Sequence, residues 1–491
     1  MPLPSISLRS IPGTVAFLGC GDLYADRFCS DSRRIQPGDV FIAVRGHSVD
    51  GGAFAASAVR SGATAIITEQ PFSDLPVPQC IVRNARVTRA WIAMAQHGFP
   101  ANRLRIAGIT GTNGKTTTAW LLRALLKSAF YRTGLVGTIE YSDGLHARTA
   151  ALTTPDPEDL AFLLQRMTAC DATHCVMEIS SHALHQHRCS PLRLAAAAIT
   201  NITRDHLDYH GSHEAYFASK LQIAELLQPG TPLLLGTDDS GCQAASRLLA
   251  HVPQRTFGFA ANCDYRVRVE CSSAAGQTLL LQLEHGALEI TTSLIGNHNA
   301  LNLLAAAALA QQLQVSDSDI VRGLTEVSEI PGRMESISCG QSFSVFVDFA
   351  HTPDGLRQAI DALRPITSQR LIILFGARGD RDRDKRPLMA AAVESADLIF
   401  VTSDNPRSEA PAQIIEDICR GFSEESCVQK IADRESAIRS AIFAARPGDS
   451  ILIAGRGHET IQQIQHRQIH FDDRRVAARI LRELVQQGNH Q

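Results

Sequence analysis

Short apolar runs and helix-spaced segments alternate along most of the chain. Up to about residue 100, apolar runs at 40–44 and 63–67 are separated by helical spacing, which predicts a small α/β domain. A strand-like run at 104–110 then leads through a glycine turn into a helix-like segment at 116–130. Strands and helices alternate from there to about residue 330, which predicts βαβ units around a mainly parallel sheet. The predicted elements include strands at 175–179 and 195–200 and a peripheral hairpin at 277–283 and 288–295.

The pattern restarts after Pro331 and Gly332. Each of the apolar strands predicted there runs directly into a polar loop, and the strands are 344–349, 371–375, 398–402 and 450–454. Ligands of open α/β sheets bind beyond the carboxyl ends of the strands, so these loops predict one binding crevice. We therefore predict an α/β protein with three domains, at residues 1–101, 102–330 and 331–491.

Composition is typical of a globular enzyme. The 491 residues carry 47 Lys and Arg against 50 Asp and Glu, and the net charge of -3 argues against a nucleic-acid partner. The 12 cysteines contain no CxxC pair, which argues against a zinc ribbon or a disulfide framework. Apolar runs such as 194–199 and 303–310 are too short to span a bilayer. We expect a cytoplasmic protein that does not insert into membranes.

A glycine-containing loop joins the strand predicted at 104–110 to the helix predicted at 116–130. Such loops bind phosphates, because glycines let backbone N–H groups approach and the helix N-terminus adds partial positive charge. Lys115 would neutralise the terminal phosphates, and the Thr116 hydroxyl would ligate Mg²⁺. The strict pattern requires glycine where this chain has Ile109, so a plain glycine-rich turn with an exposed lysine is the alternative. The predicted nucleotide-binding residues are Gly111, Thr112, Asn113, Gly114, Lys115, Thr116 and Thr117.

This loop, Gly-Thr-Asn-Gly-Lys-Thr-Thr, resembles the variant phosphate loop of the Mur ligase and folylpolyglutamate synthetase superfamily. The resemblance extends across almost the whole chain through MEISSHAL at 177–184, NITRDHLDYHG at 201–211, GNHNALN at 296–302 and DNPR at 404–407. It implies an N-terminal UDP-binding α/β domain, a central P-loop ATPase domain and a C-terminal Rossmann-like domain for an amino acid. It also implies an ATP-dependent ligase that adds meso-diaminopimelate to UDP-N-acetylmuramoyl-L-Ala-D-Glu in peptidoglycan precursor synthesis. We expect it to be a monomer.

A reaction that moves a γ-phosphoryl group onto a carboxylate brings two anions together, and Mg²⁺ suits it. Besides Thr116, the resemblance places metal ligands at Glu178 and His206 and a carbamylated lysine at Lys220. A free lysine is cationic at neutral pH and cannot ligate Mg²⁺, whereas the carbamate that CO₂ forms with it is an anion. The implied catalytic residues are thus Lys115, Glu178, His206 and Lys220. A transition-metal site is the other use considered for a histidine cluster, with polar loop histidines as the plainer account: His182, His185 and His187.

The remaining site residues are assigned by substrate. For ATP we expect His298, Asn299, Asn302, Arg333 and Asp348. For the UDP moiety the resemblance implies Ser30, Ser32, His47, Ser48 and Val49, and for the muramoyl peptide Leu152, Thr153, Thr154, Ser180, Gln186 and Arg188. For diaminopimelate it implies Arg386, Asp404, Asn405, Pro406, Arg407, Gly455 and Glu459. The guanidinium fork of Arg407 suits the distal carboxylate of diaminopimelate.

The implied mechanism forms an acyl phosphate from ATP and the D-glutamate γ-carboxylate, and the amine of diaminopimelate then replaces the phosphate. Because an acyl phosphate hydrolyses in water, we expect the third domain to close over the second about a hinge near Pro331 and Gly332. A lysine-adding or folate-glutamylating ligase is one alternative, and a lysine-adding enzyme would not need Arg407. A P-loop switch that controls a partner is another, but it leaves Glu178 and Lys220 without a role.

Overall fold

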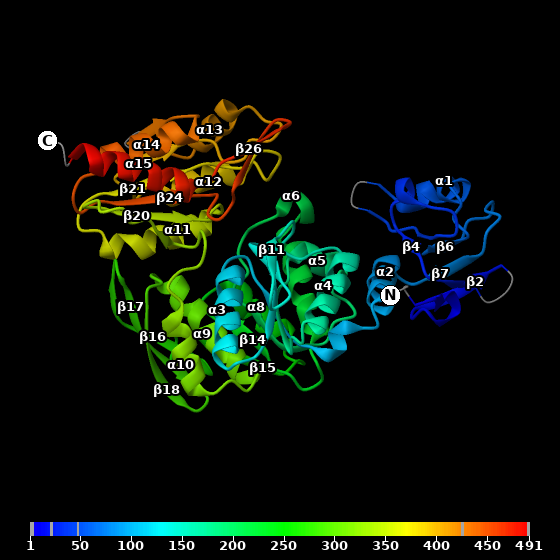
Figure 1. The fold of residues 1–491 in the computed structure, drawn as a ribbon. Coiled ribbons are helices and arrows are strands. Elements are labelled where there is room, and N and C mark those ends of the chain that lie inside the picture. The colour runs from blue at the N-terminus through cyan, green and yellow to red at the C-terminus, as the bar shows by residue number, and fades with distance from the viewer. Residues whose placement is uncertain (1–3, 20–22, 47–48, 424–426, 489–491) are drawn as a thin grey trace. The chain divides into compact units, whose positions relative to one another are not determined.

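The structure is a computed structural model that describes residues 4–19, 23–46, 49–423 and 427–488. The chain divides into two units (Figure 1). The first contains residues 1–110, 131–197 and 219–232, and the second contains residues 111–130, 198–218 and 233–491. In the part of the chain that the structure describes, no helix is long and apolar enough to cross a membrane.

The first unit opens with a small mixed sheet made of β2 (Thr14–Leu18), β7 (Gln79–Val82), β6 (Ala65–Thr68), β5 (Val40–Ile42) and β4 (Phe28–Cys29), in that order. β4 to β7 are parallel, and β2 is antiparallel to β7. Val40 and Phe41 pack into different cores, so both faces of β5 are covered. β5 covers only the first part of the apolar run at 40–44, and beyond it the Val44 carbonyl accepts a hydrogen bond from Gly51 N (3.1 Å). The helices here are α1 (Ala55–Arg60) and α2 (Ala85–Gln96).

A larger, mainly parallel set of strands completes the first unit. Its members are β11 (Ala147–Thr149), β10 (Glu140–Ser142), β9 (Thr133–Val136), β12 (His174–Glu178), β8 (Arg105–Thr110) and β13 (Leu194–Ile199), in that order, with helices α4 (Pro157–Ala169) and α5 (Ser181–His185). β12 is parallel to β8 and to β9, as the βαβ pattern predicts. Glu178, the last residue of β12, pairs with Ile109 near the end of β8.

The second unit contains the helix that follows the phosphate loop, α3 (Lys115–Ser128). It ends short of the predicted residue 130 because Phe130 adopts a φ of 61° and is 91% exposed. The predicted peripheral hairpin is present, but its second strand ends at Thr292, whose hydroxyl accepts a hydrogen bond from Leu294 N (3.2 Å). The elements here are β14 (Leu233–Gly236), α8 (Ser240–Leu248), β15 (Gln254–Gly258), β16 (Tyr265–Ser273), β17 (Gly276–Leu283), β18 (Gly286–Thr292), α9 (Asn297–Gln312) and α10 (Asp317–Glu326).

The end of the second unit is a sheet covered on both faces. Its order is β19 (Glu335–Ser336), β20 (Ser344–Asp348), β24 (Ser450–Ala454), β21 (Leu371–Phe375), β22 (Leu398–Val401) and β23 (Val428–Lys430). All neighbours from β20 to β23 are parallel, which confirms the predicted strands. Helices α11 (Pro353–Leu363), α12 (Lys385–Val393) and α13 (Pro411–Cys419) pack into the core on one face, and α14 (Arg434–Ala444) and α15 (Asp473–Gly488) pack into the core on the other.

Parallel pairing brings the loops after β20, β21, β22 and β24 to one edge of this sheet, as predicted. The sequence analysis did not predict the hairpin that follows β24, formed by β25 (Ile461–Ile464) and β26 (Arg467–His470). This hairpin pairs with Arg407 through an isolated bridge at Ile464, and it therefore borders the loop after β22.

Candidate active site

The phosphate loop contains two glycines in conformations that side chains rarely adopt. Gly111 has a φ of 149° and Gly114 a φ of 86°. A Cβ at Gly111 would lie 1.9 Å from Thr200 Oγ1, and a Cβ at Gly114 would lie 2.4 Å from Asn302 Oδ1. Close approach of neighbouring side chains therefore explains glycine at both positions.

Three other residues anchor Asn113. Its N–H donates to Asn201 Oδ1 (2.8 Å), and its carbonyl accepts from Thr200 Oγ1 (2.6 Å). Its side-chain amide donates to Asp354 Oδ2 (2.9 Å) at the start of α11. Burial raises the pKa of Asp354. The loop is thus tied to the segment after β13 and to the segment after β20, which the sequence analysis did not predict.

Lys115 and Thr116 form the first turn of α3. Lys115 Nζ donates to the carbonyls of Gly111 (2.8 Å) and Thr112 (3.0 Å), so the ammonium folds back over the loop. Thr116 Oγ1 accepts a hydrogen bond from Arg333 Nη2 (2.9 Å). The structure therefore brings Arg333 to the phosphate loop, and its contact with ATP stays a prediction.

The other expected ATP residues surround the same loop. Asn302 Oδ1 accepts from Thr118 Oγ1 of α3 (3.3 Å), and Asn302 Nδ2 donates to Asn299 Oδ1 (3.2 Å). Asp348 accepts from Met334 N (2.7 Å) and so fixes the backbone next to Arg333. These contacts support a nucleotide site built from α3, α9 and the end of β20.

Glu178 is fully buried at the end of β12. Thr138 N donates to its Oε1 (2.7 Å), and Thr138 Oγ1 donates to its Oε2 (2.9 Å). A Cβ at Gly137 would lie 2.4 Å from Glu178 Oε1, so the absence of a side chain makes room for the carboxylate. A buried carboxylate needs hydrogen-bond donors or a cation, and this one suits a divalent cation that prefers oxygen ligands.

Residues expected to bind the muramoyl peptide gather beside Glu178. Thr154 Oγ1 donates to the Glu178 carbonyl (2.8 Å) and accepts from Ser180 N (3.0 Å). Arg188 Nη1 donates to the Thr154 carbonyl (2.8 Å), and its Nη2 donates to Gln186 Oε1 (2.8 Å). Sequence segments at 152–154 and 180–188 therefore form one cluster.

Leu152 and Thr153 begin this cluster. Leu152 N donates to Tyr141 OH (3.0 Å), and its side chain is 47% exposed. Thr153 Oγ1 lies 3.1 Å from Thr138 Oγ1, which in turn binds Glu178. Substrate contact by these residues stays a prediction.

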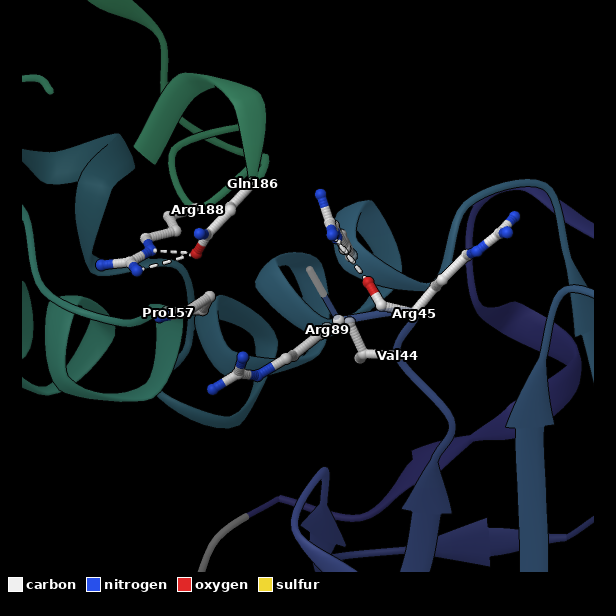
Figure 2. Close-up of a pocket in the computed structure, with 8 residues that line it drawn as sticks. Val44, Arg45, Arg89, Pro157, Gln186 and Arg188 are labelled. Carbon is white, nitrogen blue, oxygen red and sulfur yellow. Dashed lines mark hydrogen bonds between the residues drawn. The ribbon is translucent and has the colours of Figure 1, made fainter. Parts of the chain in front are cut away.

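A pocket of about 240 Å³ opens next to the cluster in the first unit (Figure 2). Its lining is rich in arginine and comprises Val44, Arg45, Gly46, Arg86, Arg89, Pro157, Gln186 and Arg188. Figure 2 shows Gln186 and Arg188 on one side of the pocket and Arg45 on the other. Arg86 Nη2 donates to the Arg45 carbonyl (2.6 Å), which fixes that side. Guanidinium groups at this density suit an anion such as a diphosphate.

Gln186 and Arg188 were predicted from the sequence as substrate contacts, whereas Arg86 and Arg89 of α2 were not. Their signal was present: Asn84 caps the helix by accepting from Arg86 N (3.0 Å), and residues three apart share a helix face. Arg89 also pairs with Glu158 at 2.7 Å, which joins α2 to the start of α4.

The structure describes three of the five residues expected to contact UDP, which are Ser30, Ser32 and Val49. His47 and Ser48 lie outside the described residues. Gly46, just before them, lines the pocket, and Val49, just after them, is 54% exposed. Ser30 and Ser32 are half-buried in the turn that follows β4, and their contact with UDP stays a prediction.

His206 lies in the loop after β13, next to a buried carboxylate. Asp205 Oδ1 accepts from His206 N (2.8 Å), and Lys385 Nζ lies 3.8 Å from the same oxygen. Burial alone would raise the pKa of Asp205, but His206 and Lys385 hold it well below its usual range. Lys220, near the end of α7 (His213–Leu221), is 1% exposed.

The histidine cluster after β12 gains no support as a transition-metal site. Among the described residues, no group of three or more His, Cys, Asp or Glu side chains is placed to hold a metal ion. The cluster comprises His182 and His185 on α5 and His187 just after it, so two of these histidines lie on a helix and not in a loop as the plainer account expected.

The hairpin β25–β26 holds the loop after β22. Gln463 N donates to Asn405 Oδ1 (2.8 Å), and Gln462 Nε2 donates to the Asp404 carbonyl (2.6 Å). Arg407 N donates to the Gln463 carbonyl (3.1 Å), and Arg407 adopts a φ of 51°. The predicted motif is therefore held by a neighbouring strand through both backbone and side chains.

Carboxylates and an amide meet beyond β22 and β24. Asn405 Nδ2 donates to Glu459 Oε2 (2.9 Å), and burial raises the pKa of Glu459. Asp404 is completely buried, and within the described part of the chain neither of its carboxylate oxygens has a hydrogen-bond partner. A Cβ at Gly455 would lie 2.8 Å from Asp404 Oδ2, so glycine leaves space beside this acid.

Two arginines of this region have different surroundings. Arg407 Nε is buried without a hydrogen-bond partner among the described residues. Arg386 is completely buried, and its terminal nitrogens pair with Glu409 and Asp417, each at 2.8 Å. Protein carboxylates therefore already engage Arg386, and its contact with an amino acid stays a prediction. The Nε of Arg386, like that of Arg407, has no hydrogen-bond partner among the described residues, so the two arginines differ in the carboxylates that hold the terminal nitrogens of Arg386.

A strand–loop–helix phosphate site, a buried carboxylate at the end of β12 and a Rossmann-like sheet with an acid- and arginine-lined loop edge are the features of an α/β nucleotide-dependent enzyme. The chain belongs to the Mur ligase family. The model described as "Mur ligase family, catalytic domain" matches residues 28–97, "Mur ligase middle domain" matches 109–310, and "Mur ligase, glutamate ligase domain" matches 332–457. These matches confirm the resemblance and the three-domain architecture.

Two similar relatives are both named UDP-N-acetylmuramoyl-L-alanyl-D-glutamate--2,6-diaminopimelate ligase. The one from Solibacter usitatus is 42% identical over 92% of this chain and 92% of its own length. The one from Geobacillus kaustophilus is 40% identical over 92% of this chain and 94% of its own. A solved structure with this name has a TM-score of 0.68 and 30% identity, and covers 98% of this chain and 100% of its own.

Proposed function

We propose that this chain is an ATP-dependent ligase that joins meso-diaminopimelate to the D-glutamate γ-carboxylate of UDP-N-acetylmuramoyl-L-Ala-D-Glu. The observation that carries the proposal is the amino-acid site: a buried Arg407 Nε without a hydrogen-bond partner among the described residues, in the same loop cluster as Asp404 and Glu459. A guanidinium suits the distal carboxylate, and the acids suit an ammonium group. Relatives named for 2,6-diaminopimelate support the same substrate.

ATP is proposed to bind with its phosphates at the N-terminus of α3. The helix end carries partial positive charge, and Lys115 adds a full one. Arg333, already bonded to Thr116, would extend this positive surface toward the γ-phosphate. Asn299 and Asn302 would border the rest of the nucleotide.

Mg²⁺ prefers oxygen ligands, and the Glu178 carboxylate and the Thr116 hydroxyl are ligands of that type. We propose these two groups and the His206 imidazole as its donors. When bound, the ion would neutralise phosphate charge. Lys220 is 1% exposed near the end of α7, and a cationic lysine cannot ligate Mg²⁺. We propose that CO₂ carbamylates Lys220, which would turn the buried amine into an anionic oxygen donor.

The proposed reaction has two displacements. An oxygen of the D-glutamate γ-carboxylate attacks the ATP γ-phosphorus, and the bond to the β-phosphate oxygen breaks to release ADP. The neutral amine of diaminopimelate then attacks the acyl-phosphate carbonyl, a tetrahedral intermediate collapses, phosphate leaves and the nitrogen loses a proton. Lys115 and the N-terminus of α3 stabilise the charge that develops on the phosphates. Arg407 positions the diamino acid for attack.

The arginine-rich pocket is proposed to bind the diphosphate of the UDP-linked substrate. Arg86 and Arg188 line it from different segments, and Arg188 also holds Thr154 beside Glu178. The peptide arm of the substrate would therefore run from the pocket toward the carboxylate-activating site.

We also propose that the enzyme works as a cytoplasmic monomer and that residues 331–491 close over residues 102–330 during turnover. Gly332 supports a hinge, because its φ of 64° is accessible to glycine without strain. X-ray scattering with an ATP analogue and the UDP-linked substrate should show a smaller radius of gyration. An unchanged radius would argue against closure.

The decisive experiment measures ADP release with UDP-N-acetylmuramoyl-L-Ala-D-Glu, ATP and Mg²⁺, comparing meso-diaminopimelate with lysine. Mass spectrometry should show a new amide with diaminopimelate. Preference for lysine would identify a lysine-adding ligase instead. ATP hydrolysis that is independent of both acceptors, with no amide formed, would favour a nucleotide-driven switch.

A further inference from the structure

Arg378 occupies the amino-acid site without having been assigned any role. It lies in the loop after β21, and its side chain is 18% exposed. Its Nη2 donates to Glu459 Oε1 (2.6 Å), and its Nε lies 3.9 Å from Asp404 Oδ1. The loop after β21 therefore brings a guanidinium to Asp404 in the loop after β22 and to Glu459 in the loop after β24.

The hydrogen bonding of Arg378 is incomplete. In the described part of the chain, its buried Nε has no hydrogen-bond partner, and the same is true of both Asp404 carboxylate oxygens. Buried polar groups are nearly always paired in folded proteins. A ligand with both a cationic and an anionic group would satisfy Asp404 and Arg378 at once.

Arg378 also lies on the side of the site that leads to the phosphate loop. Its Cζ is 5.1 Å from the centroid of the Phe349 ring, and the Cζ of Arg333 is 4.5 Å from the same centroid. Arg333 in turn donates to Thr116. Phe349 therefore connects the guanidinium of the nucleotide site with that of the amino-acid site.

This position distinguishes Arg378 from Arg407. The attacking amine must reach an acyl phosphate formed near the phosphate loop, so the carboxylate on the same carbon as that amine belongs on the Phe349 side. The distal carboxylate, at the other end of the diamino acid, belongs with Arg407. Burial and the nearby charges of Arg381 and Arg378 lower the pKa of Arg407, so anionic groups between these guanidiniums would relieve repulsion.

We propose that Arg378 binds the carboxylate adjacent to the attacking amine. Arg378 and Arg407 would then each bind one of the two terminal carboxylates of a diamino dicarboxylic acid. This inference rests on the proposed function. It makes Arg378 a specificity-determining residue that also orients the nucleophile. The plainer alternative is that Arg378 only neutralises Glu459 inside the folded domain.

The test combines Arg378→Gln and Arg378→Lys with three acceptors: meso-diaminopimelate, its monoamide at the reacting end and its monoamide at the distal end. Arg378→Gln should raise KM for diaminopimelate about 10- to 100-fold while the KM for ATP stays near the wild-type value. Amidation at the reacting end should raise the KM of wild type for the acceptor strongly but should hardly change the KM of Arg378→Gln. Amidation at the distal end should raise the KM of both proteins by the same factor. Arg378→Lys, which keeps the charge but loses the fork, should fall between them.

Arg383→Gln is the matched control, because Arg383 belongs to the same loop but its side chain is 67% exposed. It should leave every KM unchanged. The inference would be overturned by an unaltered KM for diaminopimelate in Arg378→Gln. It would also be overturned if amidation at the reacting end raised KM by the same factor in wild type and variant. If Arg378→Gln does not fold, the same comparison with Arg378→Lys decides. Failure of wild type to join diaminopimelate at all would instead refute the proposed function.

Discussion

Arg333 donates a hydrogen bond from Nη2 to Thr116 Oγ1 at 2.9 Å, although the two residues are 217 positions apart. Thr116 belongs to the first turn of α3, and Arg333 follows the predicted boundary between the second and third domains. This contact joins the start of the predicted third domain to the first turn after the phosphate loop. We therefore predict that ATP binding depends on Arg333.

Arg333→Lys should weaken use of ATP. Lysine keeps the charge but loses the planar fork that contacts both Thr116 and the Phe349 ring. We expect KM for ATP to rise about 10-fold, the effect of losing one charge-assisted hydrogen bond. ADP release at varied ATP measures it, and Arg420→Lys, with a side chain 69% exposed, is the control. A KM equal to that of wild type would show that the contact has no part in nucleotide binding.

Gly114→Ala should damage the phosphate loop more than backbone strain alone explains. Gly114 has a φ of 86° and Gly230 a φ of 81°, so alanine is strained by about 1 kcal/mol at either position. An added Cβ meets Asn302 Oδ1 at 2.4 Å at Gly114 and nothing within 4 Å at Gly230. Calorimetric titration with ATP should show binding lost in Gly114→Ala and retained in Gly230→Ala. Similar affinities in both variants would contradict the close packing.

Lys220→Ala should lower turnover by on the order of 100-fold or more, because it removes a proposed ligand of the catalytic metal. Added bicarbonate should rescue nothing in this variant. Carbon-13 NMR with labelled bicarbonate should show a carbamate signal in wild type and not in Lys220→Ala. Lys430→Ala, with a side chain 48% exposed, should keep both the signal and the activity. Full activity of Lys220→Ala would refute the role.

Arg407→Lys should raise KM for diaminopimelate about 10- to 100-fold, with little change in KM for ATP. The reason is that a lysine ammonium cannot pair with a carboxylate through two parallel hydrogen bonds. The preference for diaminopimelate over lysine should fall by the same factor, since lysine has no distal carboxylate. Steady-state assays with both amino acids measure this, with the exposed Arg467 changed to lysine as the control. An unchanged preference would remove Arg407 from substrate selection.

His174 should make the fold sensitive to mild acid. Burial, assisted by the charge of Arg105, lowers its pKa from 6.5 to about 4. The unfolded chain therefore takes up a proton at higher pH than the folded protein does, and stability should decline as pH falls from 6.5 to about 4. Urea unfolding at several pH values should show a shallower decline in His174→Gln than in wild type. The exposed His251, changed to glutamine, should leave the decline unaltered.

The sequence by itself determined the order and type of the main elements. Apolar periodicity reports which side of a segment is buried, so β8, β12, β20, β21, β22 and β24 were all predicted close to their final bounds. Motifs with local geometry were equally visible, because a phosphate loop and its helix are consecutive in the chain. Gln186 and Arg188, which a motif match had assigned to the substrate, line the arginine-rich pocket.

Only the tertiary structure decided which distant side chains meet. Asn113 bonds to Asp354 across 241 positions, and Arg378 bonds to Glu459 across 81. Arg86 reaches the pocket because α2 packs against a different segment of the first unit. The spacing of residues in the sequence does not indicate such pairs. Each partner is a single polar residue, and its neighbour in space depends on how the helices and strands pack. Arg86, Arg89 and Arg378 could therefore be named only once the fold was in place.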